Sequence, residues 1–510
     1  MSLRPGSLVA LLLLLLSAPA PSIGSPAAAG ENIESAVIAV SPSRIHLGRL
    51  LQWCDDVWLA TDDPIAKARA VPLLSSANQN WMRGERFGTA RDLARAVGAL
   101  RREEGATTIE RWAGALSILP ELRTIDGAAF DGSVPFSITV HDPTVRHPAT
   151  GGAIEIVADG HPAARVEIDP ADPPEGIVLA LPAEFRGDVP CSVRILHDGE
   201  VVREYAEAFG IVDGAHERTR AILRDLRDLP RTAERDTVFG LEKQLFRNPA
   251  ALEMPLPPNA ALARIEHLAD HARRGAPDPS LRAAGDRWFV LPVGFIATPC
   301  RVLVPEHADG DELPLVVTVH GMGGSEQNFF EIYGRGLAAR LAAERGWIVA
   351  SPGGLGMIGS GADVNDIVTA LEELLPVDRS KVFLIGHSLG AMRIVKATGD
   401  APRRYRAIAP LSGTGPIAPG TDLGRLPAYV AAGAQDFGLG MSQVLKTVLE
   451  TSNAAVTYRE IDPAEHIMMV PEVLPEVFRF FEQALESEPE RGTGETTPAS
   501  APEEPRRTRL

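Results

Sequence analysis

The sequence predicts an α/β chain with a mostly parallel sheet in its C-terminal part. From about residue 286, short apolar runs alternate with helical stretches, as in a parallel sheet covered by helices on both faces. One of these runs leads through a G-x-S-x-G segment into a helix. Before residue 286 the pattern differs, because helical segments there flank a stretch of short alternating runs. That stretch predicts a small β-sandwich-like domain.

Residues 1–24 are typical of a signal peptide. Arg4 supplies a positive charge, Leu8–Leu16 is an unbroken apolar run, and small residues such as Ala18, Ala20 and Gly24 follow. A run this short cannot cross about 30 Å of hydrocarbon, which takes roughly 20 residues. An uncleaved N-terminal anchor is the alternative. We therefore expect a secreted or periplasmic protein with no stable membrane insertion after signal removal.

Composition excludes several classes of function. The net charge is −17, and a chain this acidic is a poor candidate for binding nucleic acid, which needs a basic stripe. Its three cysteines are too few for a disulfide scaffold, and none forms a C-x-x-C pair that would suggest structural zinc. One disulfide is possible outside the cytoplasm, but the sequence does not indicate which cysteines would pair.

The chain before residue 286 divides into three expected regions. Residues 25–128 should be helical, with Leu93, Ala96, Val97 and Leu100 on one face of a helix. Residues 129–212 should form the β-sandwich-like domain, and residues 213–285 a helical linker region. The expected strands of the sandwich are Phe136–Val140, Ala153–Val157, Arg165–Ile168, Ile177–Leu179 and Ser192–Leu196.

The helical linker region contains one histidine pair. The second helix expected there begins at Asn259 as N-cap and stops at Gly275. His267 and His271 lie four residues apart on it, a spacing that can bind a metal. There is no H-E-x-x-H motif and no evident third ligand. We therefore interpret them as surface or packing histidines and expect no metal site.

The expected α/β domain spans residues 286–485, and residues 486–510 form a polar tail that we expect to be disordered. Helices are expected at Leu337–Arg345 and Asp363–Leu375. The expected buried strands are Cys300–Val304, Leu315–His320, Trp347–Ser351, Val382–Gly386, Ala407–Leu411, Ala428–Ala432 and Ala455–Ile461.

Ser388 is the predicted catalytic nucleophile. It stands in Gly386-His387-Ser388-Leu389-Gly390, between a predicted strand and a predicted helix. A tight strand-to-helix turn makes the serine hydroxyl project above the sheet, and small residues on either side let strand and helix approach closely. The alternative is a serine that happens to lie in a tight turn.

A glycine-rich loop upstream is the predicted oxyanion hole. A strand there ends in His320-Gly321-Met322-Gly323-Gly324. We assign the backbone N–H groups of Met322 and Leu389 as donors, and either Gly321 or Gly323 could replace Met322. His320 should shape the loop, His387 should pack at the turn, and both could touch substrate. A purely structural turn is the alternative.

The base and the acid follow from chain order, which in this arrangement runs serine, carboxylate, histidine. His466 is the one histidine after Ser388, so it is the predicted base. Asp436, just beyond the strand Ala428–Ala432, is placed to orient it. Asp462 and Glu465 are close to His466 in sequence, but a loop residue rarely turns back onto its own histidine.

These residues together resemble the α/β-hydrolase superfamily, and within it the esterases related to polyhydroxybutyrate depolymerases, feruloyl esterases and dienelactone hydrolases. The resemblance lies in His320–Asn328, Val377–Val382 and Gly433–Asp436, and covers roughly residues 286–485. It implies Ser388 as nucleophile, Asp436 as acid and His466 as base. That family is also similar to the catalytic domain of prolyl-oligopeptidase-type peptidases, which leaves peptidase activity open.

The sequence thus predicts a secreted serine esterase that acts on a small-molecule or polymeric ester and needs no cofactor. The sequence leaves open whether the protein forms a homo-oligomer. One alternative is a serine peptidase or acyl transferase with the same triad. The other is a non-catalytic surface-binding protein whose hydrolase domain is a relic.

Overall fold

The computed structural model describes residues 40–101, 108–142, 145, 151–168, 174–251, 256–308, 310–354 and 361–487. The predicted signal peptide lies outside these residues, as does all but the start of the predicted tail. Among the helices of the described ranges, none has the length and apolar character needed to cross a membrane.

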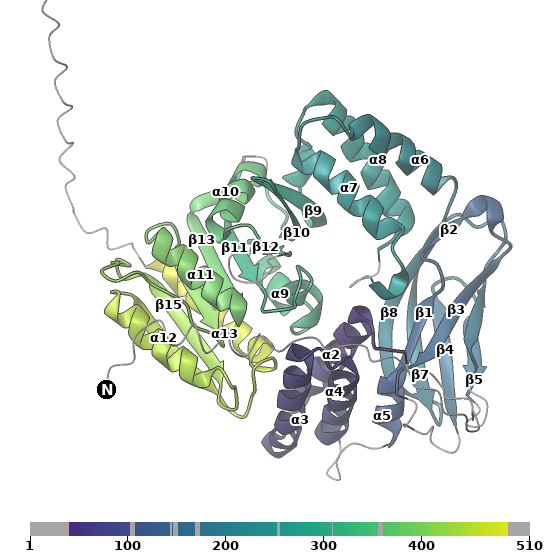
Figure 1. Cartoon of the computed structure of the whole chain (residues 1–510), viewed down its shortest axis with the longest axis horizontal. Helices are drawn as coiled ribbons and strands as arrows, with labels where there is room; N and C mark the ends of the chain where they lie inside the picture. The colour runs from purple at the N-terminus through teal and green to yellow at the C-terminus, as the bar shows by residue number, and fades with distance from the viewer. Residues whose placement is uncertain are drawn as a thin grey trace, which may run out of the picture. The chain divides into compact units, whose positions relative to one another are not determined.

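Four helices open the described chain (Figure 1): α2 (Arg44–Leu59), α3 (Pro64–Met82), α4 (Arg86–Arg101) and α5 (Thr108–Ala115). The Ser43 side chain caps α2 by accepting from the N–H of His46, and the Asp63 side chain caps α3. The apolar face expected on α4 is buried. The helical region ends at Ala115, earlier than the expected boundary at 128, because Leu116–Pro120 pairs as a strand with Ser133–Val140.

Two sheets follow, as expected for a β-sandwich. One has the order β1-β3-β6 and the other the order β2-β8-β7-β4-β5. Rings of Phe136 and Phe209, one from each sheet, meet edge to face with centroids 5.8 Å apart. The strands are β1 (Leu116–Pro120), β2 (Thr124–Asp126), β3 (Ser133–Val140), β4 (Gly152–Ala158), β5 (Ala164–Glu167), β6 (Gly176–Ala180), β7 (Gly187–His197) and β8 (Glu200–Val212).

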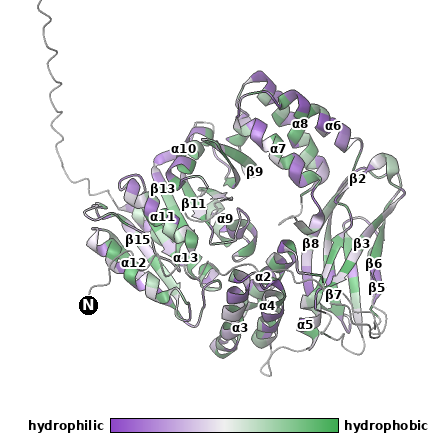
Figure 2. Cartoon of the chain, viewed as in Figure 1, coloured by the Kyte–Doolittle hydropathy of each residue, from purple (hydrophilic) through white to green (hydrophobic). Residues whose placement is uncertain are grey.

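Helices α6 (Ala215–Leu226), α7 (Ala233–Leu245) and α8 (Pro258–Arg274) share an apolar core. Green and purple alternate along them in Figure 2, as expected of helices with one buried face. Gly275 ends α8 in the left-handed conformation, as predicted. Asn259 is not the N-cap. Pro258 begins the helix, and the Asn259 N–H donates instead to Asp188 at 2.8 Å.

The C-terminal part is built on an eight-stranded sheet of order β16-β15-β14-β13-β11-β12-β10-β9. Strands β11 to β16 are parallel, whereas β10 runs antiparallel to both of its neighbours. β9 was not among the expected strands. The strands are β9 (Gly285–Val293), β10 (Ile296–Val304), β11 (Leu313–Val319), β12 (Ile348–Pro352), β13 (Val377–His387), β14 (Ala407–Leu411), β15 (Pro427–Gly433) and β16 (Ala455–Ile461).

Helices cover this sheet on both faces, as predicted. Along β13, Phe383 and Ile385 belong to one core cluster and Val382 and Leu384 to another, because side chains alternate across a strand. The first cluster includes residues of α9 (Leu337–Ala343) and α13 (Met469–Glu486). The second includes residues of α10 (Val364–Leu374), α11 (Leu389–Asp400) and α12 (Leu439–Thr451).

All three cysteines are buried and unpaired in the structure: Cys54 on α2, Cys191 on β7 and Cys300 on β10. The disulfide that the sequence left open is therefore not formed here. Burial raises the pKa of the Cys191 thiol to about 12, and Glu207 adds to this effect. A thiol in such surroundings is neutral and unreactive at neutral pH.

Candidate active site

The candidate site lies where parallel strands reach their carboxyl ends. His320 and Gly321 follow β11, Ser388 follows β13, and Asp436 and His466 come after β15 and β16. β11 and β13 pair directly near the middle of the sheet (Figure 1). In open α/β sheets, ligands bind at the carboxyl ends of the strands. The sheet therefore brings the predicted residues to one edge.

Ser388 occupies a strained turn between β13 and α11. Its φ is 56° and its ψ −117°, a conformation that non-glycine residues rarely adopt. A Cβ on Gly386 would lie 2.4 Å from the carbonyl oxygen of Gly390, and a Cβ on Gly390 would lie 2.0 Å from that of Val319. Only glycine fits either position, so the turn needs both residues that the motif supplies.

The glycine-rich loop lies directly against this turn. A Cβ built on Gly321 would be 3.1 Å from the Ser388 Cβ. The ring of His320 is buried, and its Nδ1 lies 2.7 Å from the carbonyl oxygen of Gly321. Because a carbonyl only accepts, Nδ1 carries the proton and His320 braces the loop. Leu389 begins α11, so its N–H is one of the unpaired donors at a helix N-terminus.

His466 and Asp436 are hydrogen-bonded. The Nδ1 of His466 lies 2.9 Å from the Oδ1 of Asp436, and both side chains are almost fully buried. Burial raises the pKa of Asp436, but the hydrogen bond and charge of His466, with further bonds from Ser412 and the Gly438 N–H, leave it below its ordinary value. The carboxylate is therefore ionised at neutral pH and fixes the imidazole with Nδ1 protonated.

His387 holds the backbone of His466. Its Nε2 lies 2.9 Å from the His466 carbonyl oxygen, and its Nδ1 lies 2.9 Å from the hydroxyl of Tyr333. Burial and then the neighbouring His466 lower the pKa of His387 to about 3, so the ring is neutral. Its single proton must sit on Nε2, because a carbonyl only accepts, and Tyr333 therefore donates to Nδ1.

Ser388 and His466 line one cavity of about 250 Å³. Gly321, Met322, Gly323 and His387, four further residues that the sequence singled out, line it too. Asp436 lies behind the histidine, and His320 and Leu389 are not among the residues that line the cavity. The structure thus brings the predicted nucleophile, base and acid together and leaves His320 as a loop-bracing residue.

Sequence reasoning missed Tyr333 and Phe437 at the site, and it considered Glu465 only as an alternative acid. Tyr333 supports His387, as described above. The exposed ring of Phe437 lies 4.3 Å from the His466 ring, centroid to centroid. The buried Glu465 accepts from the N–H groups of Ile467 and Met468, which shapes the turn after His466. Phe437 and Glu465 adjoin predicted residues, so sequence proximity was a signal, but nothing in the sequence connected Tyr333 with this edge.

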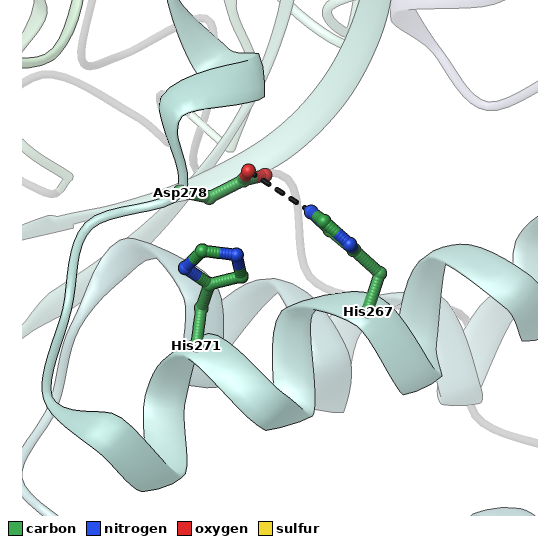
Figure 3. A group of neighbouring side chains, drawn as sticks. All are labelled: His267, His271 and Asp278. Carbon is green, nitrogen blue, oxygen red and sulfur yellow. Dashed lines mark hydrogen bonds and ion pairs between the residues drawn. The ribbon is translucent and has the colours of Figure 1, made fainter.

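The histidine pair on α8 gains a third neighbour (Figure 3). His267, His271 and Asp278 present ligand atoms within 4.8 Å of one another, so these residues could hold a metal ion. Asp278 follows the helix and was not among the residues that the sequence analysis singled out. Its buried carboxylate already bonds His267 at 3.0 Å and pairs with Arg264 at 2.8 Å. The charge of Arg264 opposes a cation there, and the cluster reads as a network that fixes the loop after α8.

A family model described as "Alpha/beta hydrolase family" matches residues 316–505. Among curated proteins, no sequence matches this chain. Similar solved structures include an S-formylglutathione hydrolase from Agrobacterium tumefaciens, at 15% identity over 40% of this chain and 97% of that one, with a TM-score of 0.34. An esterase from Pyrobaculum calidifontis is 15% identical over 40% of this chain and 87% of its own, with a TM-score of 0.33.

A third similar structure is a fluorophosphonate-binding serine hydrolase of Staphylococcus aureus, at 15% identity over 40% of this chain and all of that one (100%), with a TM-score of 0.33. The family match covers the strands and loops that carry the candidate site. It confirms the fold class expected from the sequence and the resemblance to the α/β-hydrolase superfamily. The C-terminal part of this chain therefore has the α/β-hydrolase fold.

Proposed function

We propose that the protein is a serine hydrolase that cleaves carboxylic esters through Ser388, His466 and Asp436. The observation that carries the proposal is the His466–Asp436 hydrogen bond beside a serine held at a strained strand-to-helix turn. Asp436 accepts a hydrogen bond from the proton-bearing Nδ1 of His466, so the Nε2 of His466 is left to act as the base. The resemblance to esterases favours esters over peptides as substrates. Secretion, predicted from residues 1–24, is part of the same proposal.

The proposed reaction has two steps. The Ser388 Oγ attacks the acyl carbonyl while His466 Nε2 takes its proton, and the oxyanion accepts hydrogen bonds from the N–H groups of Leu389 and Met322. His466 then gives the proton to the leaving alcohol, and an acyl-enzyme remains. Water, deprotonated by His466, attacks this acyl group and releases the acid, and Ser388 recovers its proton.

The test is labelling with a fluorophosphonate probe together with hydrolysis of p-nitrophenyl acetate. The parent should do both, and Ser388→Ala should do neither. Ser380→Ala is the matched control, because Ser380 is an exposed serine near the start of the same strand, β13. A Ser388→Ala protein as active as the parent would refute the nucleophile. A parent that neither labels nor hydrolyses would favour the non-catalytic alternative.

Substrate class needs a second measurement. A panel of p-nitrophenyl esters, anilides and short peptides should show esters cleaved with the highest kcat/KM. Faster cleavage of peptides than of esters would replace the esterase proposal with the peptidase alternative while leaving the proposed roles of the three residues in place.

A further inference from the structure

Helices of the N-terminal half form one wall of the cavity that contains Ser388. Its lining includes Gly48 and Leu51 from α2, Leu74 and Trp81 from α3, and Leu93 from α4. These residues stand about 300 positions before the nucleophile in the sequence. The α/β-hydrolase domain therefore supplies the reacting groups, and the first three helices supply the opposite side of the space.

Several contacts fix α2 and α3 against the loops around the candidate site. The Arg44 guanidinium donates to the carbonyl of Gly323 at 2.8 Å, and the Gln52 amide donates to that of Glu331 at 2.8 Å. The indole of Trp81 packs on Gly323, where a Cβ would lie 2.9 Å from its Nε1. The wall is thus bonded to the oxyanion loop itself.

The wall is mainly apolar, and the one buried guanidinium in it, that of Arg49, is paired with a carboxylate. Leu47, Leu74 and Leu93 line the cavity and are otherwise buried. Arg49 also lines it, but its guanidinium is 2.7 Å from Glu207. Arg335 pairs with Asp56. An anionic substituent would have to compete with these carboxylates for Arg49 and Arg335. Arg44, the other arginine of the lining, is exposed to solvent and donates to the Gly323 carbonyl, so the apolar interior of the space suits an uncharged group.

One polar atom in this wall has no protein partner among the described residues. Asn78, on α3, lines the cavity, and its Nδ2 is buried without a hydrogen-bond acceptor. An unsatisfied buried amide is costly unless an acceptor arrives. An oxygen in a bound substrate would satisfy it.

We propose that α2, α3 and α4 form a subsite for the uncharged, apolar group of an ester substrate, with Asn78 donating to an oxygen in that group. This rests on the proposed function of Ser388. The cavity of about 250 Å³ lies just below the range typical of drug-sized ligand sites, so it suits a medium-length chain or a single ring. The preferred substrates are neutral esters with an apolar chain or ring of about that size.

Gly48 offers a way to fill the subsite without breaking the helix. A Cβ there meets only the Ile332 Cδ1, at 3.9 Å. Gly48→Leu would place a branched side chain in the cavity, and Gly48→Ala is the matched control, because alanine and leucine are both strong helix formers. Equal melting temperatures of the two variants would establish that both fold.

The first measurement is kcat/KM for p-nitrophenyl esters from acetate to palmitate. For the parent it should rise by up to about fourfold per methylene as far as octanoate and then fall. The octanoate-to-acetate ratio should be at least tenfold lower in Gly48→Leu than in Gly48→Ala. Asn78→Leu should lower the rate for an octanoate analogue with an ether oxygen in its chain, relative to octanoate. Equal ratios in the two Gly48 variants would overturn the subsite.

The second measurement does not depend on catalysis. Calorimetric binding of octanamide should be at least tenfold weaker to Gly48→Leu than to Gly48→Ala. If no ester is hydrolysed but octanamide binding follows this pattern, the subsite stands and the proposed function fails. If esters are hydrolysed but octanamide binds both variants equally, the proposed function stands and the subsite fails.

Discussion

The Asp55 carboxyl makes the attachment of α2 sensitive to pH. Asp55 is buried on α2 and accepts a hydrogen bond from the N–H of Gly334, in the segment after Phe330. Burial raises the pKa of Asp55 to about 8, helped by Asp56 and opposed by the Gly334 bond and Arg335. At neutral pH the carboxyl is therefore protonated in the folded protein and ionised in the unfolded chain.

The sign of the effect follows from proton binding. Between the ordinary pKa of 3.8 and about 8, the folded state holds a proton that the unfolded chain releases. The free energy of unfolding therefore falls as pH rises through this window, by about 1.4 kcal/mol per pH unit. Between pH 5 and pH 7, Asp55 alone should lower the free energy of unfolding by about 3 kcal/mol. Below pH 3.8 Asp55 does not lower the free energy of unfolding, and above about pH 8 its effect on that free energy has reached its full size.

Asp55→Asn tests this directly, because an amide matches the protonated carboxyl in shape and still accepts from Gly334. In urea denaturation at pH 5, 6 and 7, the free energy of unfolding of the variant should rise relative to that of the parent by about 3 kcal/mol between pH 5 and pH 7. Asp62→Asn is the control, since Asp62 is an exposed aspartate just after the same helix. Parallel pH dependences of Asp55→Asn and the parent would refute the buried, protonated carboxyl.

Three further predictions concern the candidate site. Gly390→Ala places a methyl group 2.0 Å from the Val319 oxygen, so it should lower the free energy of unfolding by about 2 kcal/mol or more, read from denaturant midpoints; an unchanged midpoint would contradict the close approach. Tyr333→Phe removes the donor to His387 and should lower kcat about tenfold with little change in KM; a change in KM alone would assign Tyr333 to substrate binding. Asp436→Asn should lower kcat by a factor on the order of 10⁴ while circular dichroism stays unchanged; near-parental kcat would remove Asp436 from the reaction.

Much of the C-terminal fold could be predicted because its signals are local. Each central strand is a short apolar run bounded by turn residues, and Ser388 sits in a motif whose flanking strand and helix are both recognisable. The strand β1 was missed because Leu116–Pro120 follows α5 with no breaker between them, and only pairing with β3 makes it a strand. Asn259 is not the cap because Pro258 already begins the helix, and a distant carboxylate, Asp188, accepts from the N–H groups of Asn259 and Ala260 that a capping side chain would otherwise satisfy.

The surroundings of the site could not be predicted, because they depend on contacts between distant segments. Gln52 and Glu331 are 279 residues apart, and so are Asp55 and Gly334. No sequence motif marks either contact, and each of these residue types is common in helices and loops. Position in the folded chain, and not residue type, makes Asp55 a buried acid and Gly48 part of a cavity wall.

One face of α2 connects these predictions. Gly48, Leu51, Gln52 and Asp55 recur at i, i+3, i+4 and i+7, so they form a single stripe along the helix. The first two line the cavity. Gln52 both lines it and bonds Glu331 in the short π-helix Asn328–Ile332, and Asp55 bonds Gly334 just after that helix. A shift of α2 large enough to break the Asp55 bond would also move the cavity wall. Ionisation of Asp55 above about pH 8 leaves a charge in a buried position, which favours displacement of α2 towards solvent. Chain-length preference should therefore change before hydrolysis of acetate is lost, because the reacting groups come from the sheet and the wall comes from the helix.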